Sequence, residues 1–133
     1  MRPLVQVFKE SFVELLYEED HNIIVANWMG YLKQEDIRLG CMALNEFIKK
    51  SRIKKHLSNQ SQLKVLSRDV QSYIIHTWFP EVEKLGLQKI AIFASADIFA
   101  RDSVDHVNMN VADGNLEIRT KYSMQQCMDW LIN

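Results

Sequence analysis

The fold is decided by the stretch Lys89-Ile-Ala-Ile-Phe-Ala-Ser95. Its apolar and small residues follow one another without alternation, which is typical of a strand buried on both faces. Such a strand needs helices on both sides of its sheet, so we expect it at the centre of an α/β sheet. Gly86 precedes the stretch, and Asp97 after it is suited to begin a helix.

The N-terminal third predicts a β-hairpin. Residues 12–17 and 23–29 are rich in β-branched and aromatic side chains, and the polar loop 18–22 separates them. A short polar loop between two such runs indicates antiparallel pairing. Residues 1–10 are interpreted as a lead-in segment.

Helices and further strands alternate after the hairpin. A helix is expected over 34–50, where Ile37, Cys41, Leu44 and Ile48 share one face. A short strand over 53–58 and a loop over 59–66 follow. The next helix begins after Ser67 and is kinked or restarted at Pro80.

The C-terminal part continues this alternation. We expect a helix from Asp97 to about Val111, a turn at Asp113-Gly114, a strand over 116–122 and a closing helix. Ser123 and Gln126 have the spacing of a capping box for that last helix. The order predicts a single α/β domain over residues 1–133, with a mixed sheet of about five strands covered by about four helices.

The composition excludes several classes of protein. The chain has 133 residues, 47% of them hydrophobic and 25% charged, and a net charge of −1. A generic nucleic-acid binder would carry a basic excess, and no apolar run is long enough to span a membrane. Cys41 and Cys127 occupy apolar helix positions and are expected to be buried free thiols. A cytoplasmic location is therefore expected.

Several segments together resemble the small SpoIIAA-like or STAS-like proteins of bacteria. The resemblance covers nearly the whole chain and implies a fold of that class. It rests on residues 12–17, Glu19-Asp-His-Asn22, Asn27-Trp-Met-Gly30, Trp78-Phe-Pro80, Lys89-Ile-Ala-Ile-Phe93 and Met128-Asp-Trp-Leu131.

The resemblance implies two roles. STAS modules bind a partner protein, and phosphorylation of a serine at a helix start releases it. The matching place here offers Ser58, Asn59 and Ser61, without the Asp-Ser-Ser-Gly pattern of the regulators. Related folds that bind lipids or other apolar ligands imply the other role.

Two groups of residues suggest a ligand site. Ligands of open α/β sheets bind beyond the carboxyl ends of strands, where Ser58, Asn59, Ser95 and Asp97 stand. These polar residues either hold a ligand or cap helices. A second group of large side chains either lines an apolar cavity or packs in the core, and consists of His76, Trp78 and Phe79.

A basic run near the middle of the chain is a candidate anion site. The alternative is a solvated helix end, which the helix dipole favours. The run consists of Lys49, Lys50, Arg52, Lys54 and Lys55.

No cofactor or metal motif is found. An enzyme using Asp97, Asp102 or His106 is the least favoured hypothesis. We expect a non-enzymatic protein-interaction or regulatory module. The alternative is a binding domain for a small molecule or lipid, with a pocket near the end of the 89–95 strand. The partner is thus an unidentified protein or a small apolar ligand. The apolar residues Leu4, Val5, Val7 and Phe8 either pack across a homodimer or cover their own sheet.

Overall fold

A six-stranded mixed sheet forms the centre of the fold. The computed structural model describes residues 4–109 and 116–133. The strands follow one another across the sheet in chain order, and the predicted mixed sheet therefore has six strands rather than about five. They are β1 (Val5–Glu10), β2 (Val13–Glu18), β3 (Ile23–Gly30), β4 (Lys55–Leu63), β5 (Lys89–Phe93) and β6 (Glu117–Lys121).

The pairing of neighbouring strands changes once across the sheet, from antiparallel to parallel at β3. β1, β2 and β3 are antiparallel neighbours, whereas β3, β4, β5 and β6 are parallel. Parallel neighbours need crossover connections, and helices lie in all three crossovers. The helical segments are α1 (Gln34–Ser51), α2 (Arg68–Tyr73), the π-helical turn η1 (Ile74–Trp78), α3 (Phe79–Lys84), α4 (Ile98–Met109) and α5 (Met124–Ile132).

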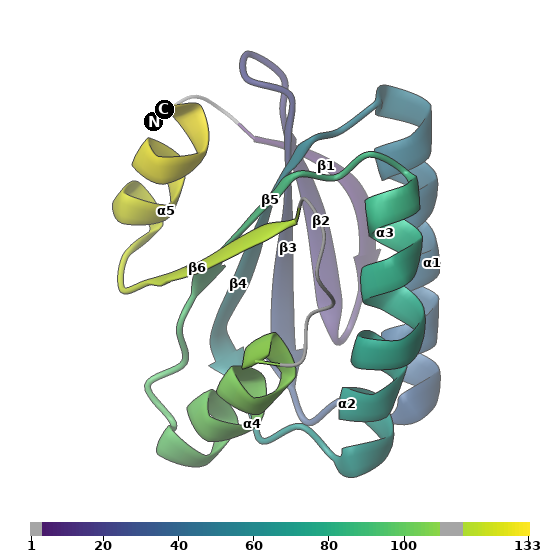
Figure 1. The fold of residues 1–133 in the computed structure, drawn as a ribbon, viewed down its shortest axis with the longest axis vertical. Coiled ribbons are helices and arrows are strands. Elements are labelled where there is room, and N and C mark those ends of the chain that lie inside the picture. Colours follow the sequence, from purple (N-terminus) through teal and green to yellow (C-terminus); the bar gives the residue numbers. More distant parts are fainter. Residues whose placement is uncertain (1–3, 110–115) are drawn as a thin grey trace.

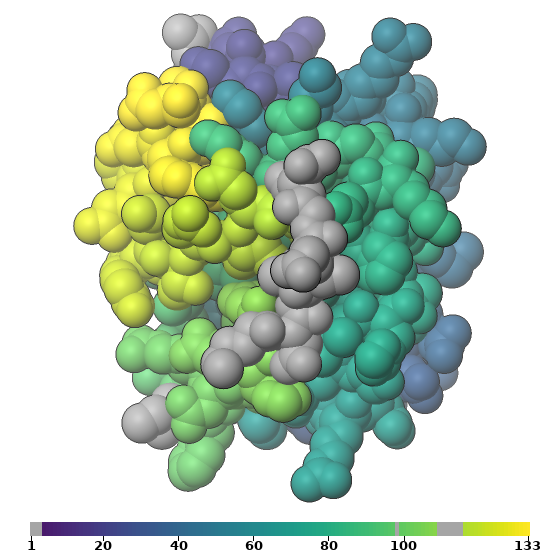
Figure 2. All heavy atoms as spheres, viewed as in Figure 1, coloured from purple at the N-terminus to yellow at the C-terminus, as the bar shows by residue number. Residues whose placement is uncertain are grey.

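The helices form two unequal layers. α1 and the continuous α2–η1–α3 segment lie on one side of the sheet, and α5 lies on the other (Figure 1). α4 lies toward one end of the strands. With all atoms drawn, α5 and β6 form one flank of the molecule and α1 with α2–α3 the other (Figure 2).

Each face of the sheet has its own hydrophobic core, because successive strand residues point to opposite faces. The larger core lies under α1 and α2–α3 and includes Ile24, Leu44 and Val82. The smaller core lies under α5 and includes Val25 and Leu57. The buried free thiols predicted from the sequence are present, with Cys41 in the first core and Cys127 in the second.

The central position expected for the 89–95 stretch is wrong. β5 covers Lys89–Phe93 and is second from one edge of the sheet. Its middle residues Ile90, Ala91 and Ile92 are nevertheless buried, because α5 packs on one face and the larger core fills the other. Burial on both faces therefore indicates helices on both sides and does not determine a strand's place in the order.

The interpretation of residues 1–10 as a lead-in segment is also wrong. Val5–Glu10 forms β1, an edge strand paired with β2 and interrupted by a register shift between Gln6 and Phe8. Most of its side chains are exposed, so burial of apolar side chains contributes little to its position. Pairing with β2, which is not a local property of the sequence, makes it a strand.

The segment after α1 differs from expectation as well. β4 begins at Lys55 and runs to Leu63, so most of the predicted loop over 59–66 is strand. Its polar side chains bond to neighbours on the sheet: Asn59 Nδ2 donates to Asn27 Oδ1 at 2.8 Å, and Ser61 Oγ donates to Asn59 Oδ1 at 2.7 Å. These hydrogen bonds let a polar sequence occupy an extended, partly buried position.

The helices agree more closely with the sequence. α1 has the predicted bounds to within one residue, and the kink at Pro80 appears as the π-helical turn η1 just before it. Ser123 Oγ accepts from the amide of Gln126 at the start of α5, as a capping serine does. The predicted end of α4 at Val111 and the turn at Asp113-Gly114 lie outside the described residues.

Candidate functional site

Three polar residues form a stripe on β4 and face the larger core. His56, Ser58 and Gln60 alternate along the strand, so their side chains share one face. Ser58 lies between Ala26 on β3 and Ile92 on β5. A polar stripe between apolar strands indicates a constraint other than packing, because unpaired buried polar groups are costly.

The stripe borders a cavity of about 60 Å³ between the sheet and the helices. A water molecule needs about 10–15 Å³ by such a measure, so the cavity accommodates several waters or a few non-hydrogen atoms of a guest. It is far below the roughly 300–1,000 Å³ of typical ligand pockets. It is lined by Trp28, Leu32, Ile37, Cys41, Leu44, His56, Ser58, Gln60, Leu63, Leu66, Ile74, Trp78, Phe79, Ile90, Ile92, Val104, Val107, Asn108 and Ile118.

The chemistry of the lining favours neutral guests. Among its described residues are no aspartate, glutamate, lysine or arginine. Burial raises the pKa of the Cys41 thiol far above neutrality, with a smaller contribution from the Glu81 carboxylate, so the thiol is neutral too. An ion entering this space would lose its hydration without gaining a counter-charge.

His56 is held as one neutral tautomer. Its side chain is 1% exposed, and its Nδ1 atom lies 2.9 Å from the carbonyl oxygen of Ile24. A carbonyl oxygen only accepts hydrogen bonds, so Nδ1 carries the proton and Nε2 has the lone pair. Burial lowers the pKa of His56 to about 4, and the hydrogen bond to Ile24 opposes this only in part.

Ser58 has a hydroxyl proton available. Its oxygen accepts from Gln60 Nε2 at 2.9 Å, and the side chain is 5% exposed. Within residues 4–109 and 116–133, the structure pairs this hydroxyl with no acceptor. The cavity therefore presents an acceptor at His56 and a donor at Ser58.

The opposite wall is aromatic and rigid. Trp78 donates its indole N–H to Asn45 Oδ1 at 2.9 Å, which anchors α2–α3 to α1. The rings of Trp78 and His56 meet edge to face with centroids 6.1 Å apart, and Phe79 packs beside Trp78 at 5.6 Å. Two of the three aromatic residues predicted to line a pocket therefore do so, while His76 is exposed and outside the lining.

The remaining candidates at the strand ends have structural partners. Ser95 Oγ donates to the carbonyl of Leu63 and accepts from the amide of Asp97. Asp97 Oδ1 accepts from the amides of Phe99 and Ala100, so it caps α4. Asn59 and Ser61 bond to each other on the other face of β4, away from the cavity.

The serine positions also bear on the implied phosphorylation switch. Ser58 is buried within β4, and Ser61 lies in the same strand with its hydroxyl bonded to Asn59. Neither stands at a helix start, because α2 begins only after Ser67. Phosphorylation of Ser58 would require the strand to open.

The basic run lies where α1 ends and β4 begins. Asn22 Nδ2 donates to the carbonyls of Ser51 and Arg52 at 3.1 and 3.4 Å, which ties the β2–β3 loop to this end of α1. The anion site stays a prediction. Of its residues, all but half-buried Lys55 are exposed: Lys49, Lys50, Arg52 and Lys54.

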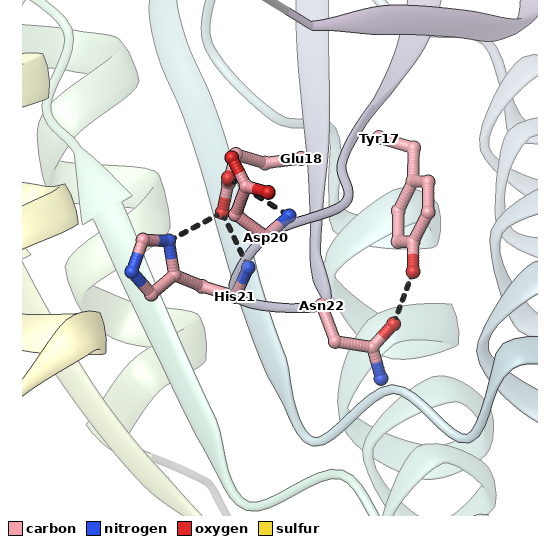
Figure 3. A network of polar contacts seen from close by, with 5 residues as sticks. All are labelled: Tyr17, Glu18, Asp20, His21 and Asn22. Carbon is pink, nitrogen blue, oxygen red and sulfur yellow. Dashed lines mark hydrogen bonds and ion pairs between the residues drawn. The ribbon is translucent and has the colours of Figure 1, made fainter. Parts of the chain in front are cut away.

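A carboxylate–histidine pair lies in the β2–β3 loop (Figure 3). Glu18 is 2% exposed, and its Oε2 atom lies 2.9 Å from His21 Nδ1 and accepts from the His21 amide at 3.0 Å. Its Oε1 atom accepts from the amide of Asp20 at 3.2 Å. These hydrogen bonds hold the loop around the carboxylate and compensate for the burial of Glu18.

Other groups with catalytic or metal-binding chemistry lie at the surface. Asp97, Asp102 and His106 are all exposed on or beside α4. Within residues 4–109 and 116–133, no three histidine, cysteine, aspartate or glutamate side chains are placed to hold a metal ion. No helix of the same residues is both long and apolar enough to cross a bilayer.

Comparison with known proteins defines the class of fold. The chain has a SpoIIAA-like α/β fold, as the resemblance implied. An uncharacterized protein of the DUF3478 family from Shewanella loihica PV-4, described as having a SpoIIAA-like fold, superimposes with a TM-score of 0.55 over 98% of this chain and 97% of its own. The two sequences are 14% identical, so the likeness concerns the fold alone.

Sequence comparisons add no further assignment. No protein-family model matches the chain, and no curated protein matches it.

Sequence reasoning missed two of the three residues of the polar stripe. The sequence points only to Ser58 as a candidate. It places His56 in the short predicted strand over 53–58 and Gln60 in the predicted loop over 59–66. Their signal is the alternation His-x-Ser-x-Gln inside a strand between two apolar strands. It becomes readable only when residues 59–63 are recognised as a continuation of β4.

Proposed function

We propose that this protein is a non-enzymatic binding domain for a small, neutral and largely apolar molecule held in the cavity beside β4. The observation that carries the proposal is the polar stripe of His56, Ser58 and Gln60 facing a mostly apolar space, whose described lining residues include no aspartate, glutamate, lysine or arginine. Binding sites for small molecules combine an apolar lining with a few converging polar groups. The size of the cavity favours a compact molecule over a lipid chain.

The rigidity of the walls supports the proposal. Trp78 is fixed by Asn45, and His56 is fixed by Ile24, so the groups around the cavity are preorganised. A preorganised site loses little conformational entropy when a guest binds.

The test is a titration followed by two-dimensional NMR, using 1-propanol and 1-chloropropane as small guests. We expect saturable shifts of the Trp28 and Trp78 indole signals for at least one guest. Native mass spectrometry of gently purified protein would show whether a molecule is already bound. If neither guest shifts these signals and the purified mass is bare, the proposal is wrong.

A matched pair of variants locates the binding. Ile74 lines the cavity, whereas its neighbour Ile75 is also half-buried but does not. Ile74→Phe fills the space and is expected to abolish guest binding. The substitution should lower the free energy of unfolding by at most about 3 kcal/mol. Ile75→Phe should leave guest affinity unchanged.

A second candidate function is protein interaction. The observation that favours it is the exposure of two large apolar side chains, Val65 at 43% and Phe99 at 70%. Exposed apolar groups often mark interfaces. A partner captured by the wild type and by a Tyr122→Ser control, but not by Phe99→Ser, would support this role. Equal capture by all three would count against this surface.

A further inference from the structure

We infer that the molecule bound in the cavity carries a hydroxyl group, which donates a hydrogen bond to Nε2 of His56 and accepts one from the hydroxyl of Ser58. This inference rests on the proposed function, since it names the chemical class of the guest. It follows from the two polar atoms of the stripe that the rest of the described chain leaves available.

The first of these atoms is Nε2 of His56. The proton of the ring is on Nδ1, which the carbonyl oxygen of Ile24 holds at 2.9 Å. Nε2 is therefore an acceptor, and within residues 4–109 and 116–133 the structure gives it no donor. Since the ring is almost fully buried and borders the cavity, a donor can reach Nε2 from the cavity.

The second atom is the hydroxyl hydrogen of Ser58. The serine oxygen already accepts from Gln60, so its remaining function is to donate. Side chains two residues apart on one strand face stand about 6.6 Å apart. A hydroxyl oxygen that makes two hydrogen bonds of about 2.8 Å at a tetrahedral angle joins atoms about 4.6 Å apart, so the bridge requires the longer His56 side chain to lean toward Ser58.

The functional groups of possible guests can be ranked by this pattern. A hydroxyl both donates and accepts, so it satisfies His56 and Ser58 together. An ether or ketone only accepts, and leaves the lone pair of His56 unpaired. A carboxylate or ammonium would enter, as an ion, a cavity whose described lining carries no counter-charge, which is strongly disfavoured.

The experiment compares 1-propanol with 1-chloropropane, which have the same number of non-hydrogen atoms. A purely apolar cavity would prefer the chloroalkane, because it leaves water more readily. The inferred hydrogen bonds reverse this order, and we expect 1-propanol to bind about fivefold or more tightly. The His56 Nε2 resonance, read from long-range proton–nitrogen spectra, should shift with 1-propanol and not with 1-chloropropane.

Variants provide an independent arm. His56→Leu should restore the preference for 1-chloropropane, while the control His76→Leu, on an exposed position of the helix, should retain the preference for 1-propanol. If His56→Leu does not fold, the shift of the wild-type His56 Nε2 resonance with 1-propanol tests the hydrogen bond instead.

The outcomes separate the two proposals. The hydroxyl inference is overturned, and the binding function remains, if both guests bind and 1-chloropropane binds as tightly as 1-propanol or more tightly. The same holds if 1-propanol is preferred but the His56 Nε2 resonance does not shift. Binding of neither guest overturns the hydroxyl inference, and together with a bare mass of the purified protein it also overturns the binding function.

Discussion

The Nδ1 atom of His56 and the carbonyl oxygen of Ile24 lie 2.9 Å apart, although the two residues are 32 positions apart in the chain. The contact crosses from β4 to β3 and fixes an imidazole inside the larger core. It pairs one ring nitrogen and leaves the other toward the cavity. The consequences concern both stability and binding.

The first prediction concerns the pH dependence of stability. Burial lowers the pKa of His56 from 6.5 to about 4 in the folded protein, so the unfolded chain binds more protons between these values. Stability is therefore highest above pH 6.5 and falls as the pH decreases toward 4. The contribution of His56 should be about 2 kcal/mol lost by pH 5 relative to pH 7.5.

The measurement is urea unfolding from pH 7.5 to pH 5 for the wild type and His56→Gln. The difference in unfolding free energy between them should change with pH in the direction given above. His76→Gln controls for the loss of a histidine from the chain. A wild-type-minus-variant difference that does not change with pH would contradict the prediction.

A second prediction concerns the contact between Gly40 and Trp28. A Cβ atom at Gly40 would lie 2.6 Å from Cη2 and 2.8 Å from Cζ3 of the Trp28 ring. Alanine improves helix propensity by about 1 kcal/mol, but overpacking a buried ring costs about 1–3 kcal/mol. Gly40→Ala should therefore destabilise the protein by up to about 2 kcal/mol net, measured by urea unfolding.

The control for this variant is Met42→Ala on the exposed face of the same helix, where the side chain is 66% exposed. It should change stability by less than about 0.5 kcal/mol. A Gly40→Ala protein as stable as the wild type would show that the Trp28 ring moves freely.

A third prediction concerns the loop network of Glu18 (Figure 3). Both carboxylate oxygens accept hydrogen bonds, from the amide of Asp20 and from the amide and ring of His21. In Glu18→Gln an amide group replaces one acceptor with donors, which should cost about 1–3 kcal/mol in unfolding free energy. Glu19→Gln, at an exposed neighbour, is the control and should have little effect.

Hydrogen exchange of the loop amides gives a local readout. Exchange at Asp20 and His21 should accelerate in Glu18→Gln and not in Glu19→Gln. Unchanged exchange in both variants would mean that the backbone turn holds without the carboxylate.

A fourth prediction concerns the anchor between Trp78 and Asn45. Trp78→Phe removes the indole donor and leaves Asn45 Oδ1 without its partner in a buried position. The lost hydrogen bond and the enlarged cavity should together cost about 2–4 kcal/mol. Trp78→Phe with Asn45→Leu should recover part of this loss, because no buried acceptor remains unpaired.

A double-mutant cycle in urea measures this coupling. Independent effects of Trp78→Phe and Asn45→Leu would show that the hydrogen bond contributes little to stability.

The local pattern of the sequence was sufficient for much of the fold. The hairpin over 12–29 and the helix over 34–50 were predicted because their signals are local: β-branched runs around a polar loop, and apolar residues with helical spacing. The strand over residues 59–63 was not predicted, because its polar residues form a strand only through hydrogen bonds to β3. β1 is a strand for the same kind of reason.

The candidate site shows the same division. Trp78 and Phe79 were predicted near a cavity because large apolar side chains cluster on one short segment. His56 was not, because nothing in the local sequence indicates the carbonyl of Ile24 or the helix that buries the ring.

The sequence by itself determined the class of fold, the hairpin, the long helices and the buried state of the 89–93 stretch. These depend on the order and periodicity of apolar residues, which bury the same faces wherever each element lies in the sheet. Only the tertiary structure decided the edge position of β1, the place of β5 beside the edge, and the cavity beside the polar stripe. These depend on pairing and packing between residues distant in the chain, where hydrogen-bond partners and unfilled space arise only once the elements are assembled.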